Sequence, residues 1–261
     1  MYFALACLSF QRQLTYRTAN LAGLITNAFF GLLRASVLIA LFGARESVAG
    51  YSLPAAVTFT GLTQALIAYI ALWGWWDVVL SIRSGEIATD LARPLDLFWQ
   101  WWARDLGRGL CQLLLRGLPM LFLYTLFYNI TLPPTWLHGL ILLPSLMLAL
   151  FVSFAWRFLI SLSALWTLEA RGIGRISAVL ITSLSGFLMP LAFFPSWATG
   201  ILRLLPFAAM VNAPVEVYLG VATGPDLLRL LALQAIWALA LLVLCRLVLA
   251  AGIRRLVIQG G

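Results

Sequence analysis

The chain has 261 residues, of which 63% are apolar and only 10% are charged, and its mean hydropathy is +0.99. Soluble domains are about half apolar and about a quarter charged, so this composition excludes an ordinary soluble protein and predicts that residues 1–261 form a single all-α integral membrane domain. The formal net charge of +8 comes from arginine alone, and because the arginines are scattered between apolar blocks, membrane topology explains them better than a nucleic-acid partner.

The first predicted element is an amphipathic helix over residues 1–18 that lies in the membrane interface, because apolar side chains recur at helical spacing from Phe3 to Leu14. Arg12 and Arg17 follow this apolar stretch, which reverses the order found in a signal peptide, so we expect the segment to be retained. A helix needs about 20 apolar residues to cross the hydrocarbon core, which leaves room for about six crossings and no soluble domain. The predicted crossings are 21–43, 55–78, 108–129, 137–166, 176–193 and 227–251.

Arginine counting orients the chain, because short loops that carry positive residues stay on the cytoplasmic side. With the N-terminus inside, the arginines of the inner loops outnumber those of the outer loops by ten to three, and an even number of crossings returns the C-terminus to the cytoplasm. The inner arginines are Arg12, Arg17, Arg83, Arg93, Arg104, Arg108, Arg171, Arg175, Arg254 and Arg255, and the outer ones are Arg45, Arg203 and Arg229.

The longest predicted cytoplasmic loop contains a short helix that starts near Gly85 and is stopped by Pro94. Ile87 and Leu91 fall on one face of this helix, and Glu86 lies at the positive end of its dipole. Such a rigid peg can transmit force from a soluble partner. The alternative is a loop helix that simply lies on the lipid headgroups.

The acidic residues of the peg form a second pattern. Glu86 and Asp90 lie one turn apart, on a different face from the apolar pair, and Asp90 is placed to form an ion pair with Arg93 at i+3.

Four prolines interrupt the apolar stretch between the last two predicted crossings: Pro190, Pro195, Pro206 and Pro214. The stretch is too broken for one spanning helix and too short for two, so it predicts short re-entrant or outer-leaflet helices.

Missing residue types exclude several chemistries. A Walker A phosphate loop needs a lysine and the chain has none, so it cannot hydrolyse ATP by that route and we expect no cofactor bound by this chain. His138 is the only histidine, and Cys7, Cys111 and Cys245 are widely spaced, so neither a catalytic triad nor a metal site is expected.

The acidic residues also argue against a carrier driven by an ion gradient, because such carriers place a carboxylate near the bilayer midplane. Here we expect three at the outer edge and six at or beyond the inner edge. The outer ones are Glu46, Glu216 and Asp226, and the inner ones are Asp77, Glu86, Asp90, Asp96, Asp105 and Glu169.

The residues of the peg and of the proline-broken stretch, in this order and spacing, resemble ABC-2 type transporter permeases over essentially the whole chain. The matching residues of the peg are Gly85, Glu86, Ile87, Leu91, Arg93, Pro94 and Leu95. Those of the later stretch are Pro190, Leu191, Ala192, Phe193, Phe194, Pro195, Ser196, Trp197, Leu205, Pro206, Phe207, Pro214, Tyr218, Leu219 and Gly220. The finer resemblance is to the subgroup in which two different permeases accompany one ATPase, sometimes associated with export of viologens.

The resemblance implies a type V exporter-like fold in which the peg is a coupling helix that contacts a nucleotide-binding subunit. The coupling residues would be Gly85, Glu86, Ile87, Asp90, Leu91, Arg93 and Pro94, and the outer gate would comprise Pro190, Phe194, Pro195, Trp197, Pro206, Phe207 and Pro214. The implied partners are two ABC ATPase subunits that bind ATP and Mg, and a second permease chain, the same or homologous. The implied place is the bacterial inner membrane, and the implied cargo is amphipathic, drug-like or lipid-like.

Two charges fall inside predicted crossings, Arg34 in the first and Arg157 in the fourth. An unpaired charge at the bilayer centre costs at least about 3 kcal/mol, so each guanidinium has to face protein, water or a ligand. One hypothesis places both on a translocation path or dimer seam that favours anionic groups, and the other makes them structural charges bonded to backbone carbonyls. Arg116 and Arg246 lie closer to the inner side and can snorkel to the interface. The rival functions are an ion-gradient carrier and a non-transporting membrane scaffold or small membrane enzyme.

Overall fold

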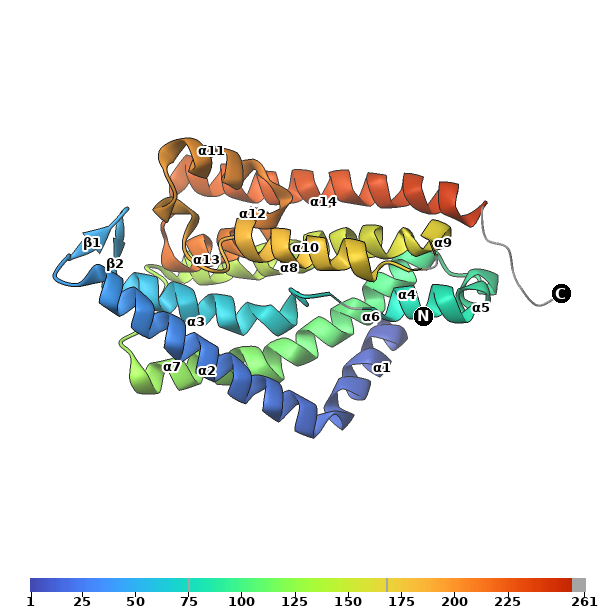
Figure 1. Ribbon diagram of the computed structural model, residues 1–261, viewed down its shortest axis with the longest axis horizontal. Coiled ribbons are helices and arrows are strands. Elements are labelled where there is room, and N and C mark those ends of the chain that lie inside the picture. Colours follow the sequence, from blue (N-terminus) through green and yellow to red (C-terminus); the bar gives the residue numbers. More distant parts are fainter. Residues whose placement is uncertain (75, 168, 255–261) are drawn as a thin grey trace.

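The computed structural model describes residues 1–74, 76–167 and 169–254 as an elongated bundle of helices (Figure 1). Arg255, one of the arginines used to orient the chain, lies outside these residues. Four helical segments of the described chain are long and apolar enough to cross a membrane: Arg17–Phe42, Leu97–Phe127, Trp136–Thr167 and Gly224–Ile253. The prediction of a mostly helical membrane protein is confirmed at this level.

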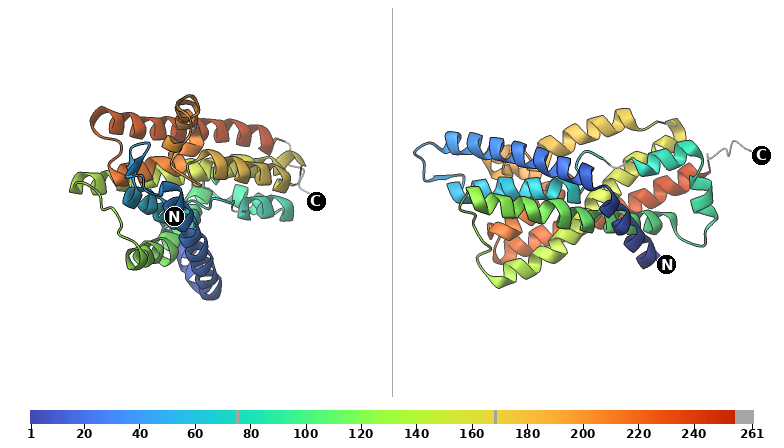
Figure 2. Two further views of the ribbon diagram at one scale, coloured as in Figure 1. Left: turned by 60° about the vertical axis from the view of Figure 1, so that its left-hand side comes forward. Right: turned by 90° about the horizontal axis from the view of Figure 1, so that it is seen from below.

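The N-terminal helix is present as α1 (Tyr2–Thr15), and α2 (Arg17–Phe42) follows it after a single residue. The right-hand view of Figure 2 shows α1 crossing the long helices at a steep angle. It approaches α6 (Leu97–Gln112) so closely that a Cβ atom at Gly107 would lie 2.0 Å from the carbonyl oxygen of Ala6. Only glycine permits this backbone contact between the two helices.

A two-residue hairpin, β1 (Ser47–Val48) paired with β2 (Tyr51–Ser52), connects α2 to α3 (Leu53–Tyr69). The prediction of one helix over 55–78 is wrong, because α3 ends at Tyr69 and the chain resumes as α4 (Asp77–Ser84). A helix end leaves backbone carbonyls without partners, and these are costly inside a membrane protein. Here side chains of α6 and α8 donate hydrogen bonds to these carbonyls.

The helix that contains the predicted crossing 108–129 begins earlier than expected, at Leu97, the first residue of α6. A π-helical turn, η1 (Leu113–Gly117), joins α6 to α7 (Leu118–Phe127), and the three form one continuous segment. The turn precedes Pro119, which has no N–H to donate to the carbonyl four residues back, so the regular α-helical ladder is interrupted there.

The centre of the bundle is α8 (Trp136–Leu162), which is followed by α9 (Ala164–Thr167). The last helix, α14 (Gly224–Ile253), lies along α8, and the Cys245 thiol contacts the Ala155 carbonyl at 3.1 Å. Both helices agree with the predicted crossings at 137–166 and 227–251. Phe98 of α6 stacks edge-on against aromatic rings of α8, which fixes α6 to this centre.

The fifth predicted crossing, 176–193, is shorter than expected. Helix α10 (Arg171–Leu184) ends where the chain turns at Gly186, whose φ of 83° is a left-handed conformation that favours glycine. The proline-broken stretch that follows forms short helices, as predicted. They are η2 (Leu191–Phe193), α11 (Ser196–Leu204), α12 (Pro206–Met210) and α13 (Asn212–Leu219).

The two ends of the bundle carry different elements. The hairpin β1–β2 and the short helices α11 and α13 lie toward one end (Figure 1). The start of α1, the end of α14, α4 and the six-residue helix α5 (Ile87–Ala92) lie toward the other. This separation places the predicted coupling peg and the predicted outer-gate segment at opposite ends of the molecule.

Candidate functional site

The candidate site is an elbow formed by α4 and α5 at the end of the bundle where the chain begins (Figure 1). Helix α4 ends at Gly85, whose φ is 79°, and the chain then turns directly into α5. Glu86 is the N-cap residue of α5, and Arg93, in extended conformation before Pro94, ends it. A short helix between Gly85 and Pro94 is therefore confirmed.

Helix α5 is too short to be stable alone, because isolated helices below about 12 residues are marginal in water. Its stability comes from contacts with α6. The Arg104 guanidinium donates to both carboxylate oxygens of Asp90, at 3.1 and 3.3 Å, and Arg93 lies 3.3 Å from the same carboxylate. Ile87 is only 1% exposed and anchors the first turn in the core. The predicted Asp90–Arg93 pair is confirmed, and Arg104 is the stronger partner that the sequence did not reveal.

The predicted division of α5 into two faces is partly wrong. Ile87 and Asp90 are both buried, Leu91 is half-buried, and Glu86 is exposed. Glu86 and Asp90 therefore do not share an environment, because contact with α6 buries the side of α5 on which Asp90 lies. The exposed residues at the tip of the elbow are Arg83, Ser84, Gly85, Glu86, Thr89, Ala92, Arg93 and Pro94.

A groove of about 860 Å³ lies between α1 and the elbow. Its walls carry charges of both signs, and an ion pair of 3.6 Å between Arg12 and Asp77 joins α1 to α4 across it. The exposed tip of the elbow is accessible from outside the chain. The rest of the elbow is held to α6 through Asp90 and to α1 through Asp77. The charged residues that line the groove are Arg12, Asp77, Arg83, Glu86, Asp90, Arg93 and Arg104.

Asp96, at the end of the elbow, connects the elbow to the first and the last helix. Its side chain caps α6 by accepting from the Trp99 backbone N–H at 3.1 Å, and it forms an ion pair with Arg246 of α14. The Asp96 backbone N–H donates to the Tyr2 hydroxyl of α1 at 3.1 Å. The elbow is therefore connected to the first and the last helix as well as to α6.

On the other side of the elbow, Arg83 of α4 forms an ion pair of 3.1 Å with Glu169 in the connection before α10. The backbone N–H of Arg171 donates to the Glu169 carboxylate at 3.1 Å. This hydrogen bond, together with the positive charges of Arg171 and Arg83, lowers the pKa of Glu169. The carboxylate is thus held in its charged form beside the elbow.

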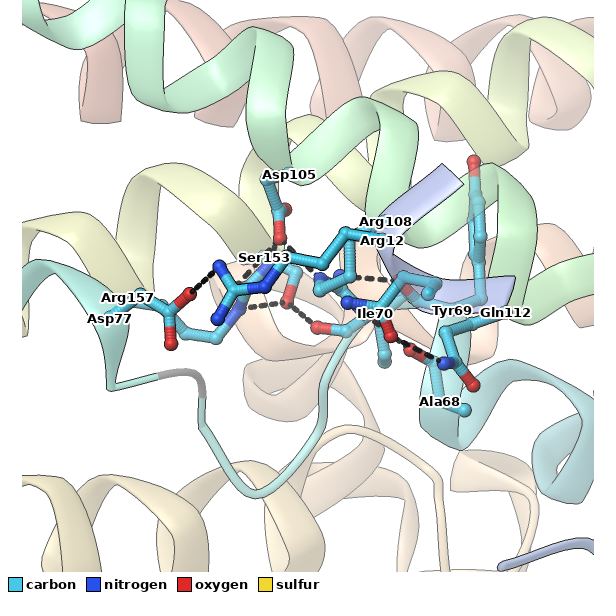
Figure 3. A network of polar contacts seen from close by, with 11 residues as sticks. Arg12, Ala68, Tyr69, Ile70, Asp77, Asp105, Arg108, Gln112, Ser153 and Arg157 are labelled. Atoms are coloured by element: carbon cyan, nitrogen blue, oxygen red, sulfur yellow. Dashed lines mark hydrogen bonds and ion pairs between the residues drawn. The ribbon is translucent and has the colours of Figure 1, made fainter. Parts of the chain in front are cut away.

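A buried ionic network lies behind the elbow, where α3 ends (Figure 3). Arg108 and Arg157 converge on the carboxylate of Asp105, each at 2.7 Å, and Asp105 is fully buried. Arg108 also donates to the carbonyls of Ala68 and Tyr69, at 2.7 and 2.9 Å. These bonds satisfy the carbonyls at the C-terminal end of α3 and explain why that helix can end inside the bundle.

Ser153 of α8 completes the network by donating to the Ile70 carbonyl at 2.6 Å, and Arg157 donates to Ser153 at 3.3 Å. The network therefore joins α3, α6 and α8. Asp105 lies in the first part of the candidate spanning segment Leu97–Phe127, where two guanidiniums neutralise it. Its place at or beyond the inner edge of the membrane stays a prediction. Arg157 has a partner that neither hypothesis considered, a carboxylate.

Arg34 is in a different environment from Arg157. Its guanidinium donates to the carbonyls of Phe187 and Leu188, after the end of α10, and lies 4.5 Å from the centre of the Phe187 ring. This geometry fits the hypothesis of a charge bonded to backbone carbonyls. Arg34 donates to Phe187 and Leu188 whereas Arg157 donates to Asp105 and Ser153, so the hydrogen bonds of the described residues give the two arginines no common partner.

The predicted outer-gate residues divide by exposure. Pro190, Pro206, Phe207 and Pro214 are buried, Phe194 is half-buried, and Pro195 and Trp197 are exposed. An ion pair of 2.7 Å between Arg203 of α11 and Glu216 of α13 ties the short helices together, beside a cavity of about 260 Å³. The sequence did not identify this pair.

The sequence missed Arg104, Asp105 and Arg108 as functional candidates. A local signal existed, because Asp105 and Arg108 are three residues apart on one helix and can pair. No local signal could have identified Arg157 or the broken end of α3 as their partners.

The four long apolar helical segments and the mostly helical fold are those of a multi-pass membrane protein. A family model described as ABC-2 family transporter protein matches residues 29–260. This chain belongs to that family, and it is a membrane component of a transport system rather than an enzyme by itself. The family implies partnership with ABC ATPase subunits. Comparisons with curated proteins and with solved structures gave no match.

Proposed function

We propose that the chain is the permease subunit of an ATP-binding cassette exporter, which moves an amphipathic, drug-like or lipid-like substrate out across the bacterial inner membrane. ATP and Mg bind to two separate ATPase subunits, and a second permease chain, the same or homologous, completes the transporter. The observation that carries the proposal is the elbow. Its tip, from Arg83 to Glu86, is exposed, and its stem is anchored by Asp90 to Arg104.

In the proposed topology the chain crosses the membrane about six times, with the elbow and both termini in the cytoplasm. The crossings are α2, α3 continued by α4, α6 continued by α7, α8, α10 with the stretch after it, and α14. The short helices α11 to α13 close the outer side. The separation of the elbow and these short helices to opposite ends supports this arrangement (Figure 1), as does the excess of inner arginines.

Helix α6 is the element that distributes force in this proposal. Three of its residues, within two turns, hold three different helices: Arg104 holds α5, Asp105 holds α8 and Arg108 holds the end of α3. Closure of the ATPase subunits pushes the elbow, and α6 transmits the displacement to α8 and to the broken crossing α3–α4. Charge-assisted hydrogen bonds of this kind contribute about 1.5–3 kcal/mol each to stability.

The test is to purify the full chain together with the proteins encoded beside it and to ask whether an ATPase remains bound. Glu86→Ala and Leu91→Ala change the elbow, and Glu46→Ala, an exposed acidic residue at the hairpin end, is the matched control. We expect the elbow variants to keep ATP hydrolysis but to lose most of the transport coupled to it, with the control unchanged. Unaltered transport per ATP in both elbow variants would contradict the mechanism.

A carrier driven by an ion gradient is the main rival, and it would need a buried carboxylate to bind the coupling ion. The described residues include three buried carboxylates, and each is paired with arginine: Asp105 with Arg108 and Arg157, Glu216 with Arg203, and Asp90 with Arg104. Collapse of the ion gradient with ionophores should therefore leave ATP-driven transport in proteoliposomes intact. Loss of transport in that experiment would favour the carrier.

A further inference from the structure

One face of α2 carries polar side chains at intervals of seven residues, which places them on a single stripe along the helix. This stripe faces polar side chains of the neighbouring helices. Asn20 accepts from the Gln112 amide at 3.0 Å, and Asn27 accepts from the Arg116 guanidinium at 3.2 Å. We call this interface the polar seam; it consists of Asn20, Asn27 and Arg34 of α2, Gln64 of α3, Gln112 of α6, Arg116 of η1 and Tyr124 of α7.

The two arginines of the seam differ in charge compensation from the other interior arginines. Arg104, Arg108 and Arg157 each bind an aspartate. Among the described residues, Arg34 and Arg116 have no carboxylate within ion-pair distance, and their hydrogen bonds go to backbone carbonyls or to an amide. The remaining described arginines without a carboxylate partner are exposed: Arg17, Arg45, Arg175 and Arg254.

The seam also concentrates polar atoms that lack a hydrogen bond. The buried atoms without a partner in the described structure include Nη1 of Arg34, Nε of Arg116, Oε1 of Gln64, Oε1 of Gln112 and the hydroxyl of Tyr124. Gln64 and Tyr124 are 1% and 0% exposed. Buried polar groups are normally satisfied, so a row of unsatisfied ones calls for a ligand or for water. Two of these atoms, Nη1 of Arg34 and Nε of Arg116, are positively charged donors, which form their strongest hydrogen bonds with anions.

Helix α2 lies closely against this row. Two of its glycines admit the facing side chains: a Cβ at Gly23 would lie 2.5 Å from the Arg116 guanidinium, and one at Gly31 would lie 2.9 Å from the Tyr124 hydroxyl. The opposite side of α2 is apolar and exposed, with Ile25 61% accessible. A displacement of α2 from α7 would therefore expose these cationic and polar side chains.

We propose that the polar seam binds the anionic headgroup of an amphiphile, a phosphate or a carboxylate, with Arg116 and Arg34 as successive binding positions. Asn27, the partner of Arg116, and Arg34 are seven residues apart on α2, so the two positions lie about 10 Å apart along the helix. The planar guanidinium matches phosphate and carboxylate geometry. This inference rests on the proposed function and narrows the cargo from amphipathic compounds in general to anionic ones.

The test measures binding of dodecyl phosphate to the full chain in phosphatidylcholine nanodiscs, with dodecyltrimethylammonium as the matched ligand of opposite charge. We expect the phosphate to bind at least about tenfold more tightly than the cation. Arg34→Gln and Arg116→Gln should each weaken phosphate binding about tenfold or more, since each removes charge-assisted hydrogen bonds. Arg175→Gln, at an exposed arginine, is the control. Equal affinity for the two amphiphiles would overturn the inference. So would unchanged affinity for dodecyl phosphate in a variant that combines Arg34→Gln with Arg116→Gln.

Arg34→Lys and Arg116→Lys guard against misfolding, because they keep the charge, and they should bind dodecyl phosphate more tightly than the Gln variants. Native mass spectrometry in nanodiscs that also contain phosphatidylglycerol separates the two sources of the headgroup. Retention of this lipid by the parent chain but not by the Gln variants identifies a resident lipid, and stimulation of the bound ATPase by dodecyl phosphate identifies a transported substrate.

The two proposals fail differently. Binding of dodecyl phosphate by a chain that retains no ATPase would refute the exporter and leave the seam standing. An ATPase that remains bound to a chain with no preference for the anion would refute the seam alone.

Discussion

Replacement of Asp105 by Asn tests the ionic junction most directly. The carboxylate lies 2.7 Å from both Arg108 and Arg157, and the three side chains are 0%, 7% and 6% exposed. The substitution keeps the shape but leaves two buried guanidiniums without a counter-charge, and breaking one buried pair in this way costs about 3–5 kcal/mol. Reversible unfolding by SDS in mixed micelles, followed by tryptophan fluorescence, measures the loss.

The control is Asp226→Asn, which removes an exposed pair with Arg229 whose side chains are 72% and 81% accessible and which contributes at most about 1 kcal/mol. A double variant, Asp105→Asn with Arg157→Gln, should lose at least about 1 kcal/mol less than the sum of the single losses, because the two residues interact directly. A loss for Asp105→Asn no larger than that of the control would refute the idea that this network holds α3, α6 and α8 together.

The remaining predictions concern the elbow, α1 and the short outer helices. Asp90→Asn should lower the free energy of unfolding by about 1.5–3 kcal/mol in the same titration, because it removes the charge that binds α5 to α6, and a loss no larger than that of Asp226→Asn would contradict this. Gly107→Ala should lower the free energy of unfolding by about 1–3 kcal/mol, because its Cβ would lie 2.0 Å from a carbonyl oxygen of α1. Gly139→Ala, at a position with open space around it, is the control. Equal stability of the two variants would show that the packing of α1 does not depend on the close contact. Glu216→Gln should raise hydrogen exchange in α11 severalfold by mass spectrometry, and unchanged exchange would show that the ion pair to α11 does not hold it.

The break between α3 and α4 is stabilised by the same side chains that form the ionic junction. The end of α3 leaves the carbonyls of Ala68, Tyr69 and Ile70 outside the helical hydrogen-bond pattern, and Arg108 and Ser153 donate to them. The same arginine is part of the junction that links α6 to α8. In the proposed mechanism, a displacement of the elbow would act on the point where the chain is interrupted between α3 and α4.

Local patterns in the sequence were enough to predict several features. Composition predicted the membrane class, and apolar periodicity predicted α1, α2, α8 and α14 close to their observed bounds. Gly85 and Pro94 predicted where α5 lies, and the prolines predicted that the stretch before α14 forms short helices. These features depend on hydrophobicity and backbone preference, which are properties of neighbouring residues.

Tertiary structure alone decided where charge is buried and what compensates it. The sequence predicted one helix as far as residue 78 and did not reveal the partners of Asp105, because neither Arg157 nor the carbonyls of Ala68 and Tyr69 is near Asp105 along the chain. The burial of Asp90 beneath Arg104 has the same origin. A buried charge is stable only with its partner in place, and the partner comes from another helix, so the position of each charge follows from how the helices assemble.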